Sequence, residues 1–186
     1  MTNQTEYRPG DTIVLVPHDP RWADDFASES ALVKAAFGDV LVELHHIGST
    51  AIPGIVAKPV IDMLAVVTDV ALLDTRPWLE HLGYEAMGEF GIQGRRYFRK
   101  TTPQGVRTHQ IHSYTVRSPE IDRHLAFRDY LRNNPKEAQQ YAQLKKDLAQ
   151  RFAIDVEGYA DAKTEFIREI ERCAMSQPLS RDKTID

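Results

Sequence analysis

The apolar run at residues 60–67, VIDMLAVV, constrains the fold most, because it contains a single acid, Asp62. A short apolar run rich in β-branched residues is typical of a buried β-strand. Side chains alternate across a strand, so Asp62 is expected on one face together with Val60, Leu64 and Val66. A buried, ionised carboxylate is costly unless a cation or hydrogen-bond donors compensate it. The fold must therefore bring a partner to Asp62.

A turn of small residues precedes this strand. Gly48, Ser49 and Thr50 follow a second strand-like run at residues 40–47. Glycine lets backbone N–H groups approach a phosphate, and the two hydroxyl groups add donors. An acid facing such a turn is typical of a site that holds a phosphate together with a divalent cation. The alternative is structural, with a hydroxyl group of the turn satisfying Asp62. The sequence leaves both interpretations open.

The rest of the chain predicts an α+β fold with one mixed sheet and a helical C-terminal third. Apolar periodicity, capping residues and a Gly-containing hairpin link give the boundaries. The elements expected are an edge strand at 13–16, a helix at 20–37, strands at 40–47 and 60–67, a helix at 70–81, a strand within 83–90, a hairpin of strands at 95–100 and 106–116, and helices beginning near 118 and 134 and spanning about 159–173.

Composition limits the class of protein. The chain has 186 residues, 42% hydrophobic and 27% charged, which is typical of one globular domain. We expect this domain at residues 10–175, with flexible tails at 1–9 and 176–186. The net charge of −4 gives no overall attraction to nucleic acid. The single cysteine, Cys173, excludes an internal disulfide, and the sequence shows no signal peptide or membrane span. We therefore expect a cytoplasmic protein without a membrane partner.

Several stretches of the chain resemble one known family. They are PHDPRW, HIGSTAIPGIVAKPVIDML, RTHQIHSY, FRDYLRNNPKEAQQYAQLKKDLAQRF and YADAKTEFI, and the resemblance covers about residues 13–170. The second stretch closely resembles the signature of the GrpB family, which is assigned to the nucleotidyltransferase superfamily. The resemblance implies a nucleotidyltransferase-like mixed β-sheet flanked by helices.

The resemblance also implies a site. In the superfamily a Gly-Ser turn holds the triphosphate, and two acids one residue apart on the next strand bind the catalytic metals. Gly48 and Ser49 match the turn and Asp62 matches the first acid, but Leu64 stands where the second acid is expected. This departure favours a reduced metal site over a two-metal site.

The histidines near the end of the expected hairpin are candidates to complete this site. His109 and His112 stand three residues apart, so in a regular strand they face opposite sides. We expect His112 to face Asp62 and His109 to be a structural or rim residue. One acid with an imidazole predicts a single divalent cation, Mg²⁺, Mn²⁺ or the softer Zn²⁺, with Asp62 and His112 as its ligands.

Basic residues are expected to neutralise the phosphates. Lys58 lies in the matching segment AKPVID, arginines cluster on the hairpin, and Lys145 and Lys163 interrupt the apolar stripes of two helices. The alternatives are a solvated, charged hairpin and lysines that extend to water. The residues expected to bind nucleotide phosphates are His46, Gly48, Ser49, Thr50, Lys58, Arg95, Arg96, Arg99 and Lys145. Those expected to act in catalysis are Asp62, His112 and Lys163.

Two functions are compatible with these residues. The leading hypothesis is transfer of a nucleotidyl group from a nucleoside triphosphate to an acceptor that the sequence does not identify. The alternative is a non-catalytic module that binds a nucleotide or coenzyme and has lost the second metal carboxylate. A purely structural or partner-binding protein would leave the small-residue turn unexplained.

Overall fold

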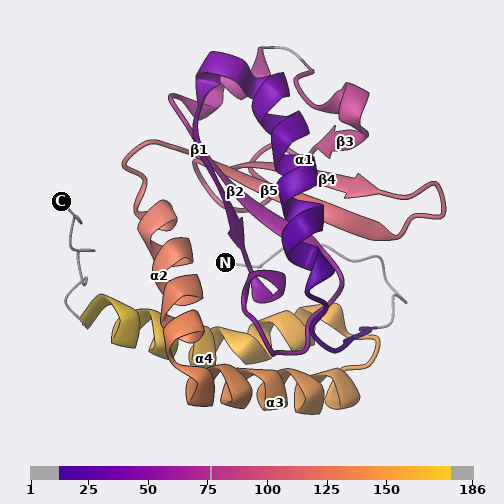
Figure 1. The fold of residues 1–186 in the computed structure, drawn as a ribbon, viewed down its shortest axis with the longest axis vertical. Helices are drawn as coiled ribbons and strands as arrows, with labels where there is room; N and C mark the ends of the chain where they lie inside the picture. Colours follow the sequence, from indigo (N-terminus) through magenta and orange to yellow (C-terminus); the bar gives the residue numbers. More distant parts are fainter. Residues whose placement is uncertain (1–12, 76, 177–186) are drawn as a thin grey trace.

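A five-stranded mixed sheet forms the centre of the computed structural model, which describes residues 13–75 and 77–176 (Figure 1). The tails expected at 1–9 and 176–186 lie outside this part of the chain, apart from Ser176. The strands, in the spatial order β1-β2-β5-β4-β3, are β1 (Leu41–Ile47), β2 (Ile61–Val67), β5 (Arg107–Thr115), β4 (Arg96–Thr101) and β3 (Tyr84–Ala86). Strands β2 and β5 run parallel, and the other neighbours are antiparallel. The predicted β4–β5 hairpin is confirmed.

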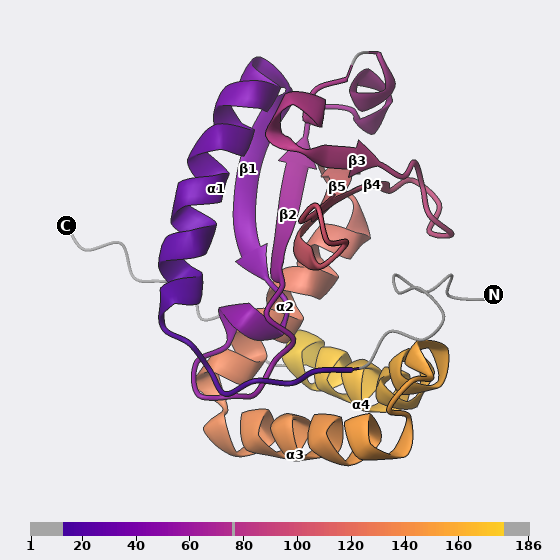
Figure 2. The ribbon, with the colours of Figure 1, turned by 90° about the vertical axis from the view of Figure 1, so that its right-hand side faces the viewer.

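Within the described residues, four α-helices surround this sheet. They are α1 (Arg21–Phe37), α2 (Pro119–Asn133), α3 (Pro135–Arg151) and α4 (Val156–Ser176). Figure 2 shows α1 along one face of the sheet, with α3 and α4 side by side beyond one end of it. The predicted α+β fold with a helical C-terminal third is therefore confirmed.

The alternation predicted for the 60–67 run is also confirmed. Ile61, Met63, Ala65 and Val67 belong to the core cluster that includes Trp22, Val33 and Phe37 of α1. On the opposite face, Leu64 and Val66 pack with Ile47, Tyr114 and Ile121, the last from α2. The two faces thus belong to different cores, and Asp62 is on the α2 side.

Local signals set the starts of the C-terminal helices. The Ser118 hydroxyl accepts a hydrogen bond from the backbone N–H of Glu120, and Pro119 and Pro135 stand at the first positions of α2 and α3. The carboxylate of Asp155 accepts from the backbone N–H of Gly158 at 2.9 Å near the start of α4. These caps explain why the helix boundaries agree with the sequence.

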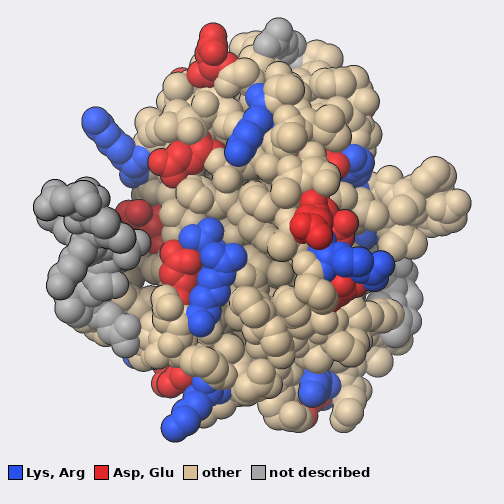
Figure 3. Space-filling model, viewed as in Figure 1, with Lys and Arg blue, Asp and Glu red and all other residues tan. Residues whose placement is uncertain are grey.

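The surface offers little attraction to a polyanion on the face drawn in Figure 3. Lysines and arginines there lie next to aspartates and glutamates instead of gathering in one patch. A nucleic acid is attracted mainly by a concentrated basic surface. Within the described residues, no helix has the length and apolar character needed to cross a membrane.

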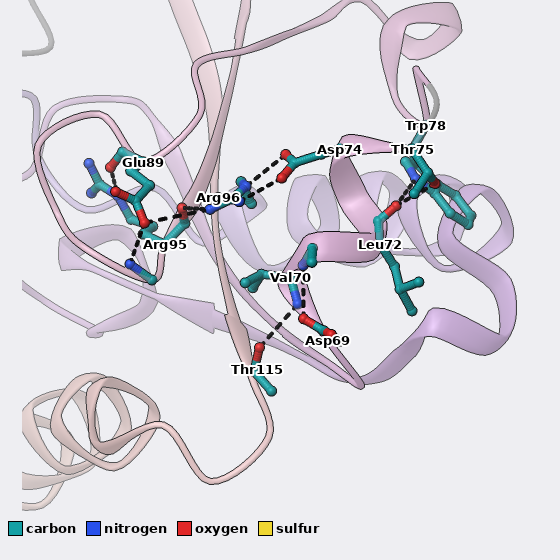
Figure 4. Close-up of polar contacts among 12 residues, drawn as sticks. Asp69, Val70, Leu72, Asp74, Thr75, Trp78, Glu89, Arg95, Arg96 and Thr115 are labelled. Carbon is teal, nitrogen blue, oxygen red and sulfur yellow. Dashed lines mark hydrogen bonds and ion pairs between the residues drawn. The ribbon is translucent and has the colours of Figure 1, made fainter.

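The helix predicted at residues 70–81 is wrong. The chain instead forms two short 3₁₀ turns, Val70–Asp74 and Glu80–Leu82. The carbonyl oxygen of Leu72 accepts from the Thr75 hydroxyl at 2.7 Å and from the Trp78 indole N–H at 3.0 Å (Figure 4). Side chains thus occupy a carbonyl group that a helix would use, and Pro77 cannot donate a backbone hydrogen bond.

Two predicted strands are shorter than expected. The run at 13–16 makes only an isolated bridge between Val16 and Ala57, and the strand expected within 83–90 is limited to Tyr84–Ala86. Strand β3 lies at the edge of the sheet, whereas Ile13 packs against Leu148 and Tyr159 of the C-terminal helices and its N–H donates to the carbonyl of Ala153, so this run is held by helices instead of by a neighbouring strand.

Candidate functional site

A cavity of about 300 Å³ lies where the sheet meets the C-terminal helices. It is bounded by the turn after β1, by β2 and β5, and by α2, α3 and α4. Eight residues predicted from the sequence line it: Gly48, Ser49, Thr50, Lys58, Asp62, His112, Lys145 and Lys163. The structure thus brings together segments separated by more than a hundred residues.

Asp62 and Gly48 define the floor of this pocket. Asp62 pairs in register with Ile47 of β1, so the residue that follows Ile47 lies directly over its carboxylate. Gly48 has φ 70° and ψ −170°, a backbone conformation that is essentially restricted to glycine. A Cβ atom on Gly48 would lie 2.3 Å from Oδ2 of Asp62. Glycine is therefore required here both by its backbone conformation and by the approach of the carboxylate.

His46 has a structural position instead of lining the pocket. The Thr50 hydroxyl donates to the carbonyl of Val60 at 3.1 Å, so its oxygen accepts from His46 Nε2 at 3.0 Å. The imidazole also stacks on Phe26, with the ring centroids 4.8 Å apart. Burial, together with the nearby guanidinium groups of α2, lowers the pKa of His46 to about 4. The ring is thus neutral and holds the two ends of the 47–60 segment together.

Two arginines of α2 hold the same turn from the other side. Arg128 Nη1 donates to the carbonyl of His46 at 3.1 Å, and Arg132 Nε donates to the carbonyl of Ala51 at 2.8 Å. Hydrogen bonds from a charged donor are stronger than neutral ones. The position of the Gly-Ser turn therefore depends on a helix that begins about seventy residues later in the chain.

Lysines from three separate segments gather at one end of the pocket. Lys163 Nζ lies 4.2 Å and Lys58 Nζ 4.9 Å from the ring centroid of Tyr159, and Lys145 Nζ lies 4.7 Å from that of Tyr141. These separations suit cation–π attraction. Lys145 is 2% exposed, so it does not extend to water. The geometry therefore favours a place in the pocket for Lys145 and Lys163 over the alternative of lysines that extend to water.

Burial changes the ionisation of two groups at this end. It lowers the pKa of Lys145 to about 7, with a further contribution from the charge of Lys163. The Lys145 ammonium donates to the carbonyl of Val56. Burial also raises the pKa of Tyr141 to about 12, against the effect of a hydrogen bond with Ser49. Tyr141 therefore stays protonated and Lys145 is poised between its two forms near neutral pH.

His112 lines the pocket at the opposite end, next to a buried arginine. Arg95 Nη1 lies 3.3 Å from His112 Nδ1, and since a guanidinium can only donate, this nitrogen accepts. Arg95 also donates to the carbonyl of Phe90 at 2.8 Å. Burial first, then neighbouring His124 and two guanidinium groups, lowers the pKa of His112 well below its usual value. Arg95 acts on the pocket through His112 and does not line it.

Arg96 and Arg99 do not reach the pocket, so their expected role in phosphate binding is not supported. Arg96 Nε donates to Asp74 Oδ1 at 2.7 Å (Figure 4), and Arg99 Nε donates to Glu85 at 2.8 Å. Arg99 faces Glu85 directly because the two are partners in the β3–β4 register. Both guanidinium groups are instead paired with carboxylates of neighbouring segments.

The residues present do not fit a metal ion held by protein ligands alone. The β2–β5 register places His112 beside Leu64, whereas Asp62 lies beside Gln110. Leu64 is fully buried in the α2-side core. Among the described residues, no three His, Cys, Asp or Glu side chains are grouped as a metal site would require. The guanidinium of Arg95 against His112 further disfavours a cation there.

Several lining residues were not predicted from the sequence: Gln110, Arg123, His124, Tyr141, Tyr159 and Glu171. Gln110 shares a strand face with His112, and Tyr159 stands one helical turn before Lys163, so periodicity contained a signal for both. Arg123 donates to Glu120 and Glu171 at 2.7 Å each. Burial lowers the pKa of His124, which was expected to be a surface or packing residue, to about 3.

The fold and the pocket together define an α+β protein in which C-terminal helices border a lysine-lined cavity beside a Gly-Ser turn. A family model described as GrpB protein matches residues 12–172. The chain belongs to the GrpB family.

Relatives agree with this assignment. The crystal structure of conserved protein GrpB from Enterococcus faecalis is 42% identical, with a TM-score of 0.82 over 87% of this chain and 97% of that one. UPF0157 protein YqkA of Bacillus subtilis is 41% identical over 167 residues, which are 89% of this chain but 48% of that protein. A dephospho-CoA kinase of Mycolicibacterium paratuberculosis is 27% identical over 86% of this chain and 45% of its own length. The chain thus spans about half of these last two proteins.

Proposed function

We propose that this protein binds the phosphate groups of a nucleotide or nucleotide-containing coenzyme in the pocket above Asp62. The observation that carries the proposal is the convergence of Lys58, Lys145 and Lys163 beside the Gly48–Ser49 turn. Ammonium groups, hydroxyl groups and a glycine turn are the donors that phosphate oxygens require. Lys145 is 2% exposed, and burial of its ammonium group is less costly when an anion shares the site.

Nucleotidyl transfer is the second candidate function. It is favoured by the position of Asp62 against the Gly48–Ser49 turn, which matches the superfamily arrangement that the resemblance implies. The burial of Leu64 at the position of the second acid weighs against it, because a two-metal mechanism needs several oxygen ligands. We therefore place phosphate binding first and transfer second.

The similarity to part of a dephospho-CoA kinase supports a coenzyme among the possible ligands. That name describes a protein acting on a phosphorylated, nucleotide-containing coenzyme precursor. The match covers 45% of the kinase, so this chain corresponds to only a part of it. A module that binds a nucleotide or coenzyme is consistent with such a partial match.

A ligand screen tests the proposal. Thermal unfolding is measured with nucleoside mono-, di- and triphosphates, dephospho-CoA and CoA, and with adenosine as an uncharged control. A ligand at about 100 times its Kd adds ~2.7 kcal/mol of stability, which is readily detected. Stabilisation by phosphorylated compounds but not by adenosine supports the proposal, and no stabilisation by any of them contradicts it.

Product analysis then separates the two candidates. Any triphosphate that binds is incubated with the protein, and release of diphosphate is followed by phosphorus NMR. Release that depends on Asp62 would favour transfer, whereas a ligand recovered intact would favour the binding module.

A further inference from the structure

We infer that the lysine cluster takes the place of a divalent cation in this pocket. The ligand is then a metal-free phosphorylated compound, such as a nucleoside mono- or diphosphate or a coenzyme, and not a magnesium–triphosphate complex. This inference rests on the proposed function and specifies its ligand class.

The first argument is the way the lysines are held. Lys58 and Lys163 lie within 5 Å of the same aromatic ring, that of Tyr159, which is 1% exposed. Tyr141 holds Lys145 in the same manner and is also buried. Two rigid buried rings thus position ammonium groups that would otherwise be flexible and repel one another. Such preorganised charge neutralises phosphate without a metal ion.

The second argument is the surroundings of Asp62. Its carboxylate is packed against Gly48, with Oδ2 only 2.3 Å from where a Cβ atom on that glycine would stand. The carboxylate is thus in close contact with the backbone of the turn. A Mg²⁺ ion placed beside it would be repelled by the ammonium groups of the lysines that line the same cavity.

The third argument is the hydration of Mg²⁺. This ion demands an octahedral shell and retains several waters when it binds phosphates. Three lysines line the cavity of about 300 Å³, and ammonium groups bind phosphate oxygens directly, without such a shell.

Calorimetric titration with and without magnesium tests the inference. ADP and inorganic tripolyphosphate are titrated into the native protein, once in EDTA and once in excess MgCl₂. We expect an affinity in EDTA equal to or higher than that in MgCl₂, since Mg²⁺ competes with the lysines for the phosphate oxygens. Weaker binding in EDTA overturns the inference but leaves the proposed function standing. Absence of binding in both buffers overturns the proposed function itself.

Substitutions further distinguish phosphate binding by the lysines alone from binding through a Mg²⁺ ion. Lys163→Gln is expected to weaken binding about tenfold or more in either buffer, whereas Lys146→Gln, on an exposed position of α3 next to Lys145, leaves it unchanged. Asp62→Asn is expected to strengthen anion binding in EDTA, because it removes a negative charge from the pocket. A loss of binding confined to MgCl₂ in this variant, with folding verified by circular dichroism, would identify a metal ligand and overturn the inference.

Discussion

Gly48 lies so close to Asp62 that a Cβ atom on the glycine would approach Oδ2 of the carboxylate to 2.3 Å. The lone acid of an apolar strand is therefore covered by the turn that precedes the strand in the sequence. This contact couples the shape of the turn to the position of the carboxylate, and both belong to the pocket in which phosphate is proposed to bind.

Gly48→Ala is expected to lower the free energy of unfolding by about 3 kcal/mol or more, because it adds a steric overlap to a strained backbone conformation. Gly54→Ala is the matched control. Gly54 also has positive φ, but a Cβ atom there meets nothing closer than 3.9 Å, so only the backbone cost of ~1–2 kcal/mol applies. Urea unfolding measures the free energy of unfolding of both variants. Equal decreases would show that the contact between Gly48 and Asp62 does not determine the cost of the substitution.

Leu64→Asp, which places a second acid on the same strand face as Asp62, is expected to destabilise the protein by about 4 kcal/mol, because it buries an unpaired charge. Leu64 is fully buried in the α2-side core. Val42→Asp on β1 serves as control, since Val42 is 50% exposed and its replacement should cost less than about 1 kcal/mol. A folded Leu64→Asp protein with new Mg²⁺ affinity, measured by calorimetry, would contradict this expectation.

Stability is expected to fall as the pH decreases from 6.5 to 4. The pKa of His46 is lowered to about 4 by burial, so below pH 6.5 the unfolded chain binds a proton that the folded protein refuses. The part of the free energy of unfolding that depends on His46 is constant above pH 6.5. It decreases as the pH falls from 6.5 to 4 and is constant again well below pH 4. His112 and His124, whose pKa values are also lowered, act in the same direction.

Comparison of His46→Gln with the native protein isolates this effect. Between pH 6.5 and 4, the free energy of unfolding of the variant should decrease by up to about 3 kcal/mol less than that of the native protein, at ~1.4 kcal/mol per pKa unit. His45→Gln is the control, because His45 contacts the exposed carboxylate of Glu43 at 2.7 Å instead of the turn. Urea unfolding at a series of pH values measures the difference, and parallel curves for His46→Gln and the native protein would refute the assignment.

Lys145→Met is expected to raise the free energy of unfolding by about 1–2 kcal/mol at pH 7 while it weakens phosphate binding. The pKa of Lys145 is lowered to about 7 by burial, so this lysine opposes folding increasingly as the pH falls from 10.5 to 7. The gain should therefore be present at pH 7 and disappear toward pH 10.5. Lys146→Met, at an exposed position, should change little. A variant less stable at pH 7 would show that the hydrogen bond to Val56 dominates.

The sequence alone was sufficient for features that depend on neighbouring residues. Alternation in the 60–67 run placed Asp62 and Leu64 on one face. The cap at Ser118 and the proline at the first position of α3, Pro135, set the starts of α2 and α3. The resemblance in the segment HIGSTAIPGIVAKPVIDML led to the correct family. Such signals are local, because strand alternation, capping and turn geometry are properties of a few consecutive residues.

Only the tertiary structure decided which charged residues meet. Arg96 and Lys163 are equally plausible phosphate ligands in the sequence, yet the first pairs with Asp74 and the second lies in the pocket. The failed helix at 70–81 has a local cause instead, since the Trp78 indole N–H donates to the carbonyl of Leu72, only six residues earlier. Charges attract over any sequence separation, so their partners depend on how distant segments pack: β4 against the 70–74 turn for Arg96, and α4 beside the 47–60 segment for Lys163. That packing is a global property of the fold, and no short stretch of residues contains it.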